Sequence, residues 1–112
     1  MKKDFSAKVI SLKDSVSYER DSIVSQAMIN RKAGTVTLFA FDRGQGLSEH
    51  TAPFDALISI MDGEALISIE KKFFRVSRSQ SIILPAGKLH SVKAAKRFKM
   101  MLVMIKGGDD HR

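Results

Sequence analysis

The sequence predicts an all-β fold, a small sandwich or barrel built from about nine short strands. Runs of branched and aromatic residues alternate with clusters of Gly, Pro, Asn, Asp and Ser, as in strands joined by turns. No segment carries apolar residues at the spacing of an amphipathic helix. The 112 residues are enough for one domain around one core.

The β pattern follows a polar N-terminal stretch. We expect residues 1–22 to be an extension that contributes an edge strand or a loop, residues 23–106 to be the barrel, and residues 107–112 to be a flexible tail. The expected strands are residues 8–12, 22–29, 35–41, 56–61, 65–69, 73–76, 81–84, 91–93 and 98–105.

One turn signal is stronger than the others. Asp62-Gly63 lies between two apolar runs, and Asp-Gly is a favoured pair for a two-residue β-hairpin. Further turns are expected at residues 30–34, 42–46, 70–72, 77–79 and 85–87.

Some strands carry apolar residues on both faces. In residues 98–105, one face holds Phe98, Met100, Leu102 and Met104. The other face holds Met101, Val103 and Ile105. A sheet with one face in water would instead alternate apolar and polar residues. We therefore expect the outer face to be covered by contact between the sheets of two subunits, which predicts a homodimer.

The composition excludes several classes of chemistry. The chain has no Cys, which excludes disulfides, thiolate catalysis, Cys-bound zinc and iron–sulfur clusters. No run approaches the ~20 apolar residues of a membrane-spanning helix, and the first residues lack the apolar core of a secretory signal. We therefore expect a cytoplasmic protein without a membrane partner.

The chain is basic, with a formal net charge of +7. The cations are spread along the sequence, and the densest group is Lys93, Lys96, Arg97 and Lys99. No recognition motif, helical stripe or set of interleaved aromatic residues accompanies this group. We interpret it as a solvated strand end and turn, and nucleic acid is not an expected partner.

The histidines His50, His90 and His111 are the candidates for chemistry. His111 falls in the expected tail, and we interpret it as a solvated side chain. His50 and His90 each follow a turn and stand at the entry to an expected strand. An imidazole titrates near neutral pH, so this pair is able to serve in acid–base chemistry or in ligand binding.

The spacing around these two histidines resembles that of the cupin superfamily. The first motif of that family reads G-x5-H-x-H-x3-E-x6-G and the second reads G-x5-P-x-G-x2-H-x3-N. The residues in register are Gly44, His50 and Gly63 for the first motif, and Pro85, Gly87 and His90 for the second. The resemblance covers roughly residues 34–106 and implies a cupin-like double-stranded β-helix, the double-sheet jelly-roll barrel.

The departures from the family pattern are Ala52, Ala56, Ser79 and Ala94, which replace the second His, the Glu, the first Gly and the Asn. Family members with a full first motif bind a divalent metal through three His and one Glu. The resemblance therefore leaves only His50 and His90 as metal ligands in this chain. Two imidazoles suit Fe²⁺, Mn²⁺, Ni²⁺, Cu²⁺ or Zn²⁺. No carboxylate is clearly placed to replace the missing Glu, since Glu49 should point away from His50.

The sequence leaves more than one function open. The first is a small-molecule-binding barrel whose pocket is lined by His50, His90, Ala52, Ala56, Phe39 and Met104. The alternative is a divergent metal-dependent enzyme, of the dioxygenase or isomerase type, with His50 and His90 as a two-histidine metal site. A structural role of the dimer surface is the third. The aromatic and Met residues also serve as ordinary core in each case.

Overall fold

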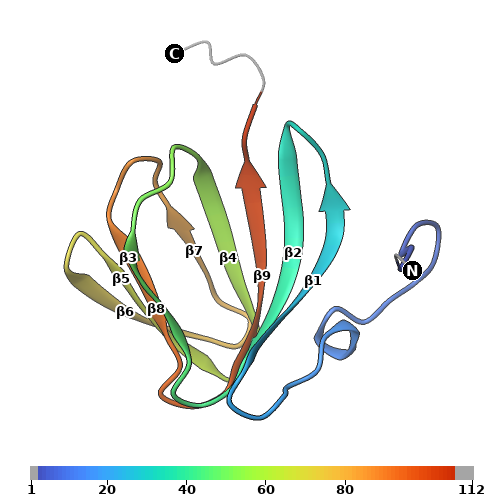
Figure 1. Cartoon of the computed structure of the whole chain (residues 1–112), viewed down its shortest axis with the longest axis horizontal. Helices are drawn as coiled ribbons and strands as arrows, with labels where there is room; N and C mark the ends of the chain where they lie inside the picture. The colour runs from blue at the N-terminus through green and yellow to red at the C-terminus, as the bar shows by residue number, and fades with distance from the viewer. Residues whose placement is uncertain (1–2, 108–112) are drawn as a thin grey trace.

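Two antiparallel sheets face each other in the computed structural model, which describes residues 3–107 (Figure 1). The sheets approach each other at one end and separate at the other. We call these the narrow end, where residues 42–45 and 94–97 turn, and the open end, where β3 stops and β8 starts. The strands are β1 (Ile23–Asn30), β2 (Gly34–Phe41), β3 (Gly46–His50), β4 (Asp55–Asp62), β5 (Glu64–Ile69), β6 (Lys72–Ser77), β7 (Ser81–Leu84), β8 (His90–Lys93) and β9 (Phe98–Ile105).

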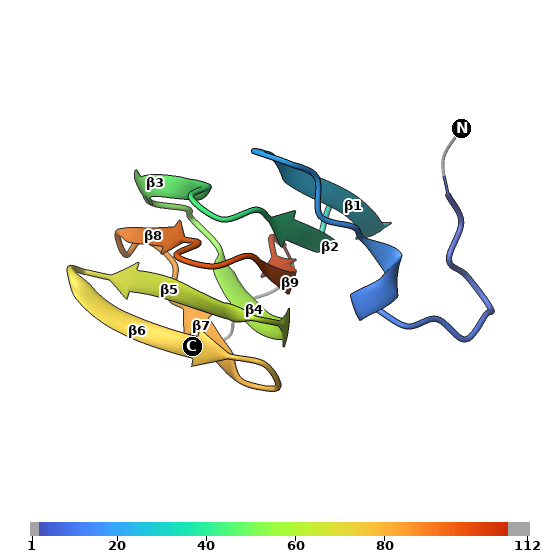
Figure 2. The same cartoon turned by 90° about the horizontal axis from the view of Figure 1, so that it is seen from below.

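The strand order places each strand of one sheet across from a definite strand of the other. The five-stranded sheet has the order β1-β2-β9-β4-β7, and the four-stranded sheet has the order β3-β8-β5-β6. Seen from below, β3 and β8 lie across from β2 and β9, and β5 and β6 lie across from β4 and β7 (Figure 2). The all-β prediction and the jelly-roll barrel are both confirmed by this arrangement.

The expected number of strands is right within the described residues, but two of the assignments are wrong. Residues 8–12 form no strand, because no neighbouring strand pairs with them, and Val9 is fully exposed. Residues 46–50, which we did not expect to be a strand, form β3 by pairing with β8. Backbone pairing at the sheet edge makes this strand, although Leu47 is its one large apolar side chain.

Apolar side chains from both sheets fill the space between them. The stacked rings of Phe41 and Phe98 lie at the narrow end, with centroids 4.6 Å apart. Both rings are fully buried, so they are among the large side chains that hold the sheets together there. The buried members of this core are Phe41, Ala56, Ile58, Ile60, Ala65, Ile67, Val76, Leu84, Val92, Ala94, Phe98 and Met100.

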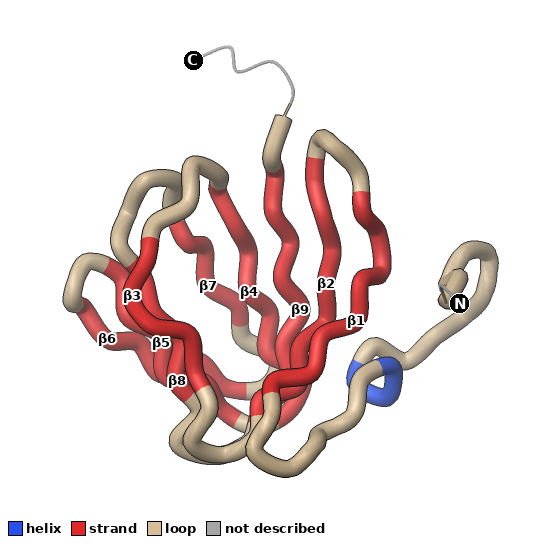
Figure 3. The backbone as a smooth tube through the Cα atoms, viewed as in Figure 1, coloured by secondary structure: helices blue, strands red, loops and turns tan. Residues whose placement is uncertain are grey.

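The N-terminal segment covers part of the outer face of the five-stranded sheet. Its 3-10 turn, Lys13–Ser15 (Figure 3), is followed by Val16, which is buried in a cluster with Leu38 and Ala40 of β2. Tyr18 anchors the segment by donating a hydrogen bond of 2.6 Å from its hydroxyl to Asp62 Oδ2. The chain therefore covers with its own residues some of the apolar surface that the sequence led us to assign to a partner.

An apolar row remains on this outer face. The register places Ile29, Val36, Val103, Leu57 and Ile83 side by side, one from each strand of the sheet. Ile29 is 53% exposed and Ile83 is 63% exposed, while the three residues between them are half-buried. We call these five residues the apolar row.

The expected Asp62-Gly63 hairpin is not a hairpin within one sheet. β4 belongs to the five-stranded sheet and β5 to the four-stranded sheet, so the chain changes sheets at Gly63. Gly63 has φ +73°, and a Cβ there would collide with the backbone of Arg97 and Phe98. The turn signal is correct, but the apolar runs on both sides of it belong to opposite walls of one core.

The remaining expectations for the chain ends are partly outside the structure. Gly107 donates its backbone N–H to Ala33 O, while the rest of the expected tail, including His111, lies outside the described residues. Among residues 3–107 we find no helix long and apolar enough to cross a bilayer.

Replacing Gly63 with Ala should destabilise the fold more than the same change at Gly44. Both glycines have positive φ, but space is open around Gly44. We expect Gly44→Ala to lower the free energy of unfolding by about 1–2 kcal/mol, for the left-handed backbone alone. Gly63→Ala should cost about 3 kcal/mol or more, because the backbone of the neighbouring turn must also move. Urea denaturation of both variants tests this, and equal losses would contradict it.

Candidate functional site

His50 and His90 lie directly opposite each other at the open end. They form a register pair between the end of β3 and the start of β8. Their Nε2 atoms are 3.1 Å apart, and the ring planes meet at 74°. Strand pairing therefore brings together two imidazoles that are forty residues apart in the chain.

The other nitrogen of each ring is bound to the backbone. His50 Nδ1 donates to Ser48 O at 2.7 Å, and His90 Nδ1 donates to Lys88 O at 3.1 Å. A carbonyl oxygen only accepts, so both Nδ1 atoms carry the hydrogen. In the neutral state each Nε2 atom therefore presents a lone pair, and the two Nε2 atoms lie close together with no hydrogen between them.

The two rings differ in their surroundings. His90 is 7% exposed and lies on the same strand face as Val92, which is part of the core, whereas His50 is exposed. Burial lowers the pKa of His90, the nearby His50 lowers it further, and the hydrogen bond to Lys88 acts in the opposite direction. The buried ring therefore favours its neutral form, which is the form that accepts a hydrogen bond or binds a metal.

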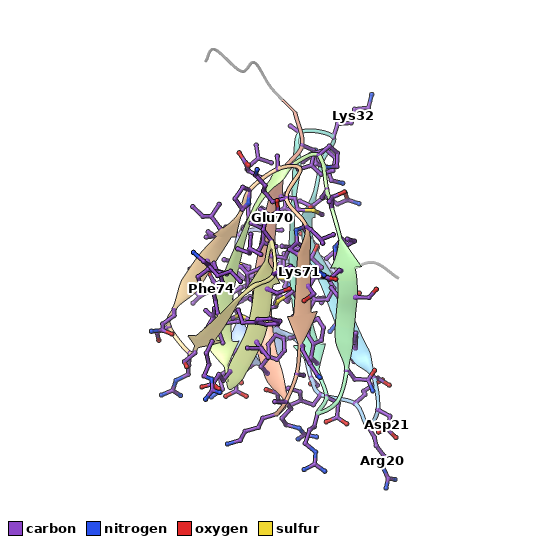
Figure 4. The ribbon with its side chains drawn as sticks, turned by 90° about the vertical axis from the view of Figure 1, so that its left-hand side faces the viewer. Arg20, Asp21, Lys32, Glu70, Lys71 and Phe74 are labelled. Atoms are coloured by element: carbon purple, nitrogen blue, oxygen red, sulfur yellow. The ribbon has the colours of Figure 1, made fainter. Side chains whose placement is uncertain are left out.

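Glu70 and Lys71 form the β5–β6 turn (Figure 4), which holds the backbone beside both histidines. Glu70 N donates to Leu89 O at 2.8 Å, and Leu89 N donates to Glu70 Oε2 at 3.2 Å. Lys71 Nζ binds Glu49 Oε1 at 2.7 Å. Glu70 and Lys71 have φ of +50° and +68°, which is a strained conformation for side chains of this kind. The sequence indicates a turn here, but not that it positions the residues next to the two histidines.

Two further hydrogen bonds join the loops at the open end. Ala52 O accepts from Gly87 N at 2.8 Å, and Asp55 Oδ1 accepts from Ala86 N at 2.8 Å. These bonds connect the β3–β4 loop and the first residue of β4 to the β7–β8 loop, which precedes His90. The loops next to the two histidines are thus fixed to each other.

The wall across from the histidines is mostly apolar. Met104 and Ala56 are register partners on β9 and β4, and Phe39 lies further along β2; all three face the core. The sheet order places β2 and β9 across from β3 and β8 (Figure 2). The predicted site residues therefore come from both walls of the open end, with Ala52 on the connecting loop, except that Phe39 packs against Phe41 towards the narrow end.

Thr35 is a further candidate for the site, which the sequence alone does not single out. It is the register partner of Met104, and it is on the inward face of β2 with Phe39. Its hydroxyl is buried, and Oγ1 has no hydrogen-bond partner among the described residues. A buried hydroxyl without a partner is uncommon and costs free energy, so it marks a place where a polar ligand atom would fit. Only the strand register distinguishes Thr35 from other threonines of the chain.

Among the described residues, no third protein ligand accompanies the histidine pair. Within residues 3–107 no His, Cys, Asp and Glu side chains form a metal-binding group of three or more. Glu49 is paired with Lys71 and Asp55 with the backbone of Ala86, so the nearby carboxylates are engaged elsewhere. Five hollows of about 220 to 480 Å³ are lined by other residues, and they do not mark this site.

Comparison with known proteins now assigns the family. No protein-family model matches the chain, and a search of curated proteins finds no match. Among solved structures, a conserved protein of unknown function from Streptococcus pyogenes is similar, with 36% identity over 92% of this chain and 90% of that one and a TM-score of 0.87. A cupin superfamily protein from Desulfitobacterium hafniense is 24% identical over 90% of this chain and 93% of that one, with a TM-score of 0.85.

A third structure carries the family name at higher identity. It is a cupin 2 conserved barrel domain protein from Leptotrichia buccalis, 34% identical over 83% of this chain, with a TM-score of 0.80. This chain spans 45% of that protein, so the likeness concerns the barrel alone. The two sheets, the paired histidines in the positions of the family motifs and these structures agree: the chain belongs to the cupin superfamily.

Proposed function

We propose that this cupin binds a small polar molecule at the open end of the barrel, between the histidine pair and Thr35. The single observation that carries the proposal is the convergence of His50 Nε2 and His90 Nε2 at 3.1 Å. The hydroxyl of Thr35 on the far wall is a further polar group free to bind. Ala56 and Met104 would provide the apolar surroundings, with Phe39 deeper in the barrel and Ala52 at the rim.

We further propose that the histidine pair holds a divalent transition-metal ion. Two acceptor nitrogens held this close repel each other, and one cation bound to both relieves the repulsion. Metal–nitrogen bonds are about 2.0–2.1 Å long, so nitrogens about 3 Å apart suit neighbouring positions on one ion. The residues present therefore fit Fe²⁺, Mn²⁺, Ni²⁺, Cu²⁺ or Zn²⁺. Such an ion would supply Lewis-acid chemistry and attract oxygen or nitrogen atoms of the bound molecule.

The small number of protein ligands has consequences for function. A site with two imidazoles binds metal less tightly than one with three or four protein ligands, and it leaves more positions for water or a bound molecule. Open positions of this kind are a feature of catalytic metal sites. A metal-dependent enzyme of the dioxygenase or isomerase type is therefore the second candidate function.

Two other expectations accompany the proposal as predictions. One is a cytoplasmic location without a membrane or nucleic-acid partner, which follows from the composition and the lack of recognition motifs. The other is a homodimer through the outer face of the five-stranded sheet. The apolar row supports it, because five apolar side chains in register cross that face.

Removing His50 should abolish metal binding. We expect untagged wild-type protein, offered each of the five metals, to retain one ion per chain with the preferred one, measured by elemental mass spectrometry after desalting. His50→Ala should retain none, because a single imidazole is a weak site. His50 is exposed, so this variant is expected to keep its fold, which circular dichroism checks.

Thr51→Ala is the matched control for the metal experiment. Thr51 is next to His50 and exposed, and its side chain takes no part in the contacts that hold the open end within residues 3–107, so its loss should leave the metal content unchanged. If wild-type protein retains none of the five metals after desalting, the metal-binding proposal is wrong. The pair would then be left with direct hydrogen bonding to a ligand as its role.

Thr35→Val should make the protein more stable. The substitution removes a buried hydroxyl that has no partner, so we expect the free energy of unfolding to rise by about 1 kcal/mol. Thr37→Val, on the same face of β2 but without an unpartnered buried hydroxyl, should change stability by less. Urea denaturation measures both. A loss of stability in Thr35→Val would mean that the hydroxyl is already satisfied in the free protein and would count against its role in ligand binding.

A charge in the apolar row should weaken the dimer. Light scattering after gel filtration should give twice the chain mass for wild-type protein and a single chain mass for Ile83→Asp at the same concentration. Val9→Asp places the same charge on a fully exposed residue outside the apolar row and should remain dimeric. A monomeric wild-type protein at every concentration would refute the homodimer.

A further inference from the structure

Three loops meet at the narrow end of the barrel and surround a hollow of about 460 Å³. The loops are residues 19–22 before β1, residues 42–45 between β2 and β3, and residues 94–97 between β8 and β9. Figure 4 shows Arg20 and Asp21 at this end, far from Glu70 and Lys71 beside the histidines. The hollow is lined by Arg20, Asp21, Asp42, Arg43, Lys96 and Arg97.

Asp42 holds the loops in place. Its Oδ2 atom accepts the backbone N–H of Asp21 at 2.8 Å, and its Oδ1 atom accepts from Arg97 Nη2 at 3.1 Å. Its own N–H donates to Ser22 O at 3.0 Å. The Asp42 side chain is only 13% exposed, and the hydrogen bonds from Asp21 and Arg43 N–H and from Arg97 lower its pKa. The carboxylate of Asp42 is therefore used within the protein.

Other contacts fix the remaining parts of the hollow. Gly44 N donates to Ala94 O at 2.7 Å, and Ala94 N donates to Gln45 O at 2.9 Å, which joins the second and third loops. The guanidinium of Arg97 lies 4.5 Å from the ring centre of Tyr18. The backbone around the hollow is thus organised before any ligand arrives, which reduces the entropic cost of binding.

Three cations of the hollow are free to bind a ligand. Arg20, Arg43 and Lys96 are exposed, and none forms an ion pair with an acidic side chain of residues 3–107. With Arg97 they make four cations against the two carboxylates of the hollow, and one of these carboxylates is already neutralised by Arg97. An excess of positive charge on fixed loops favours an anion.

We propose that this hollow binds a phosphate group, either free or carried by a small organic molecule. Two guanidinium groups provide the paired N–H donors that match phosphate oxygens, and Lys96 adds a point charge. The hollow is at the opposite end of the barrel from His50 and His90, so the proposal does not depend on the function proposed there.

The test is a titration of isotopically labelled full-length protein followed by amide chemical shifts, at a constant ionic strength of about 0.15 M. The probes are inorganic phosphate and glucose 6-phosphate, and they distinguish a free from an ester-bound group. We expect saturable binding with a Kd of about 1 mM or tighter for at least one probe. The shifted amides should belong to residues 19–22, 42–45 and 94–97.

The variant Arg43→Gln/Lys96→Gln should weaken this binding about tenfold or more, since it removes two free cations. Arg31→Gln/Lys32→Gln removes the same charge from an exposed turn at the open end and should bind like the wild type. His50→Ala should also bind like the wild type, which separates this site from the histidine pair.

Three results would overturn the proposal. One is that neither probe gives saturable binding. Another is that the two charge variants weaken phosphate binding equally, which would mean that only the overall charge of the protein matters. The third is binding of a short single-stranded oligonucleotide when neither small probe binds. That result would assign the cations to a nucleic-acid surface, whose affinity would fall steeply with salt.

Discussion

The close packing of the two sheets at the narrow end is the constraint on which the other features depend. Phe41 and Phe98 stack between the sheets there, and Gly63 lets the chain pass from one sheet to the other within a single residue. Because the sheets meet at this end, their twist separates them at the other. Polar side chains such as His50 and Thr35 lie where the walls are further apart, and the stacked rings of Phe41 and Phe98 lie where they meet.

Local chemistry made much of this fold predictable, and long-range pairing explains the rest. Branched and aromatic runs mark most of the strands, and family spacing singles out His50 and His90. β3 is hard to predict from the sequence, because it forms a strand through pairing with β8 rather than through the strand propensity of its own residues. Thr35 looks like any strand threonine until the register shows its neighbours, and the lone-pair arrangement of the histidines depends on backbone carbonyls that spacing does not reveal.

The two ends of the barrel use backbone groups in opposite ways. At the open end, the carbonyl oxygens of Ser48 and Lys88 accept hydrogen bonds from the Nδ1 atoms of the two histidines. The Nε2 atoms are therefore left as acceptors. At the narrow end, the Asp42 carboxylate accepts hydrogen bonds from the backbone and from Arg97. The other cations of the hollow remain available to a ligand. The same strands therefore separate an electron-donating site from a positively charged one.

The turn at Glu70 and Lys71 shows a trade-off between folding stability and rigidity. Asn-Gly would adopt the left-handed conformation of both positions at little cost, whereas Glu and Lys adopt it with strain. Asn-Gly would lack the carboxylate that binds Leu89 and the ammonium that binds Glu49. A protein engineer who optimised this turn for thermal stability alone would therefore loosen the chain next to both histidines, and an alignment of stable variants would give no warning of that loss.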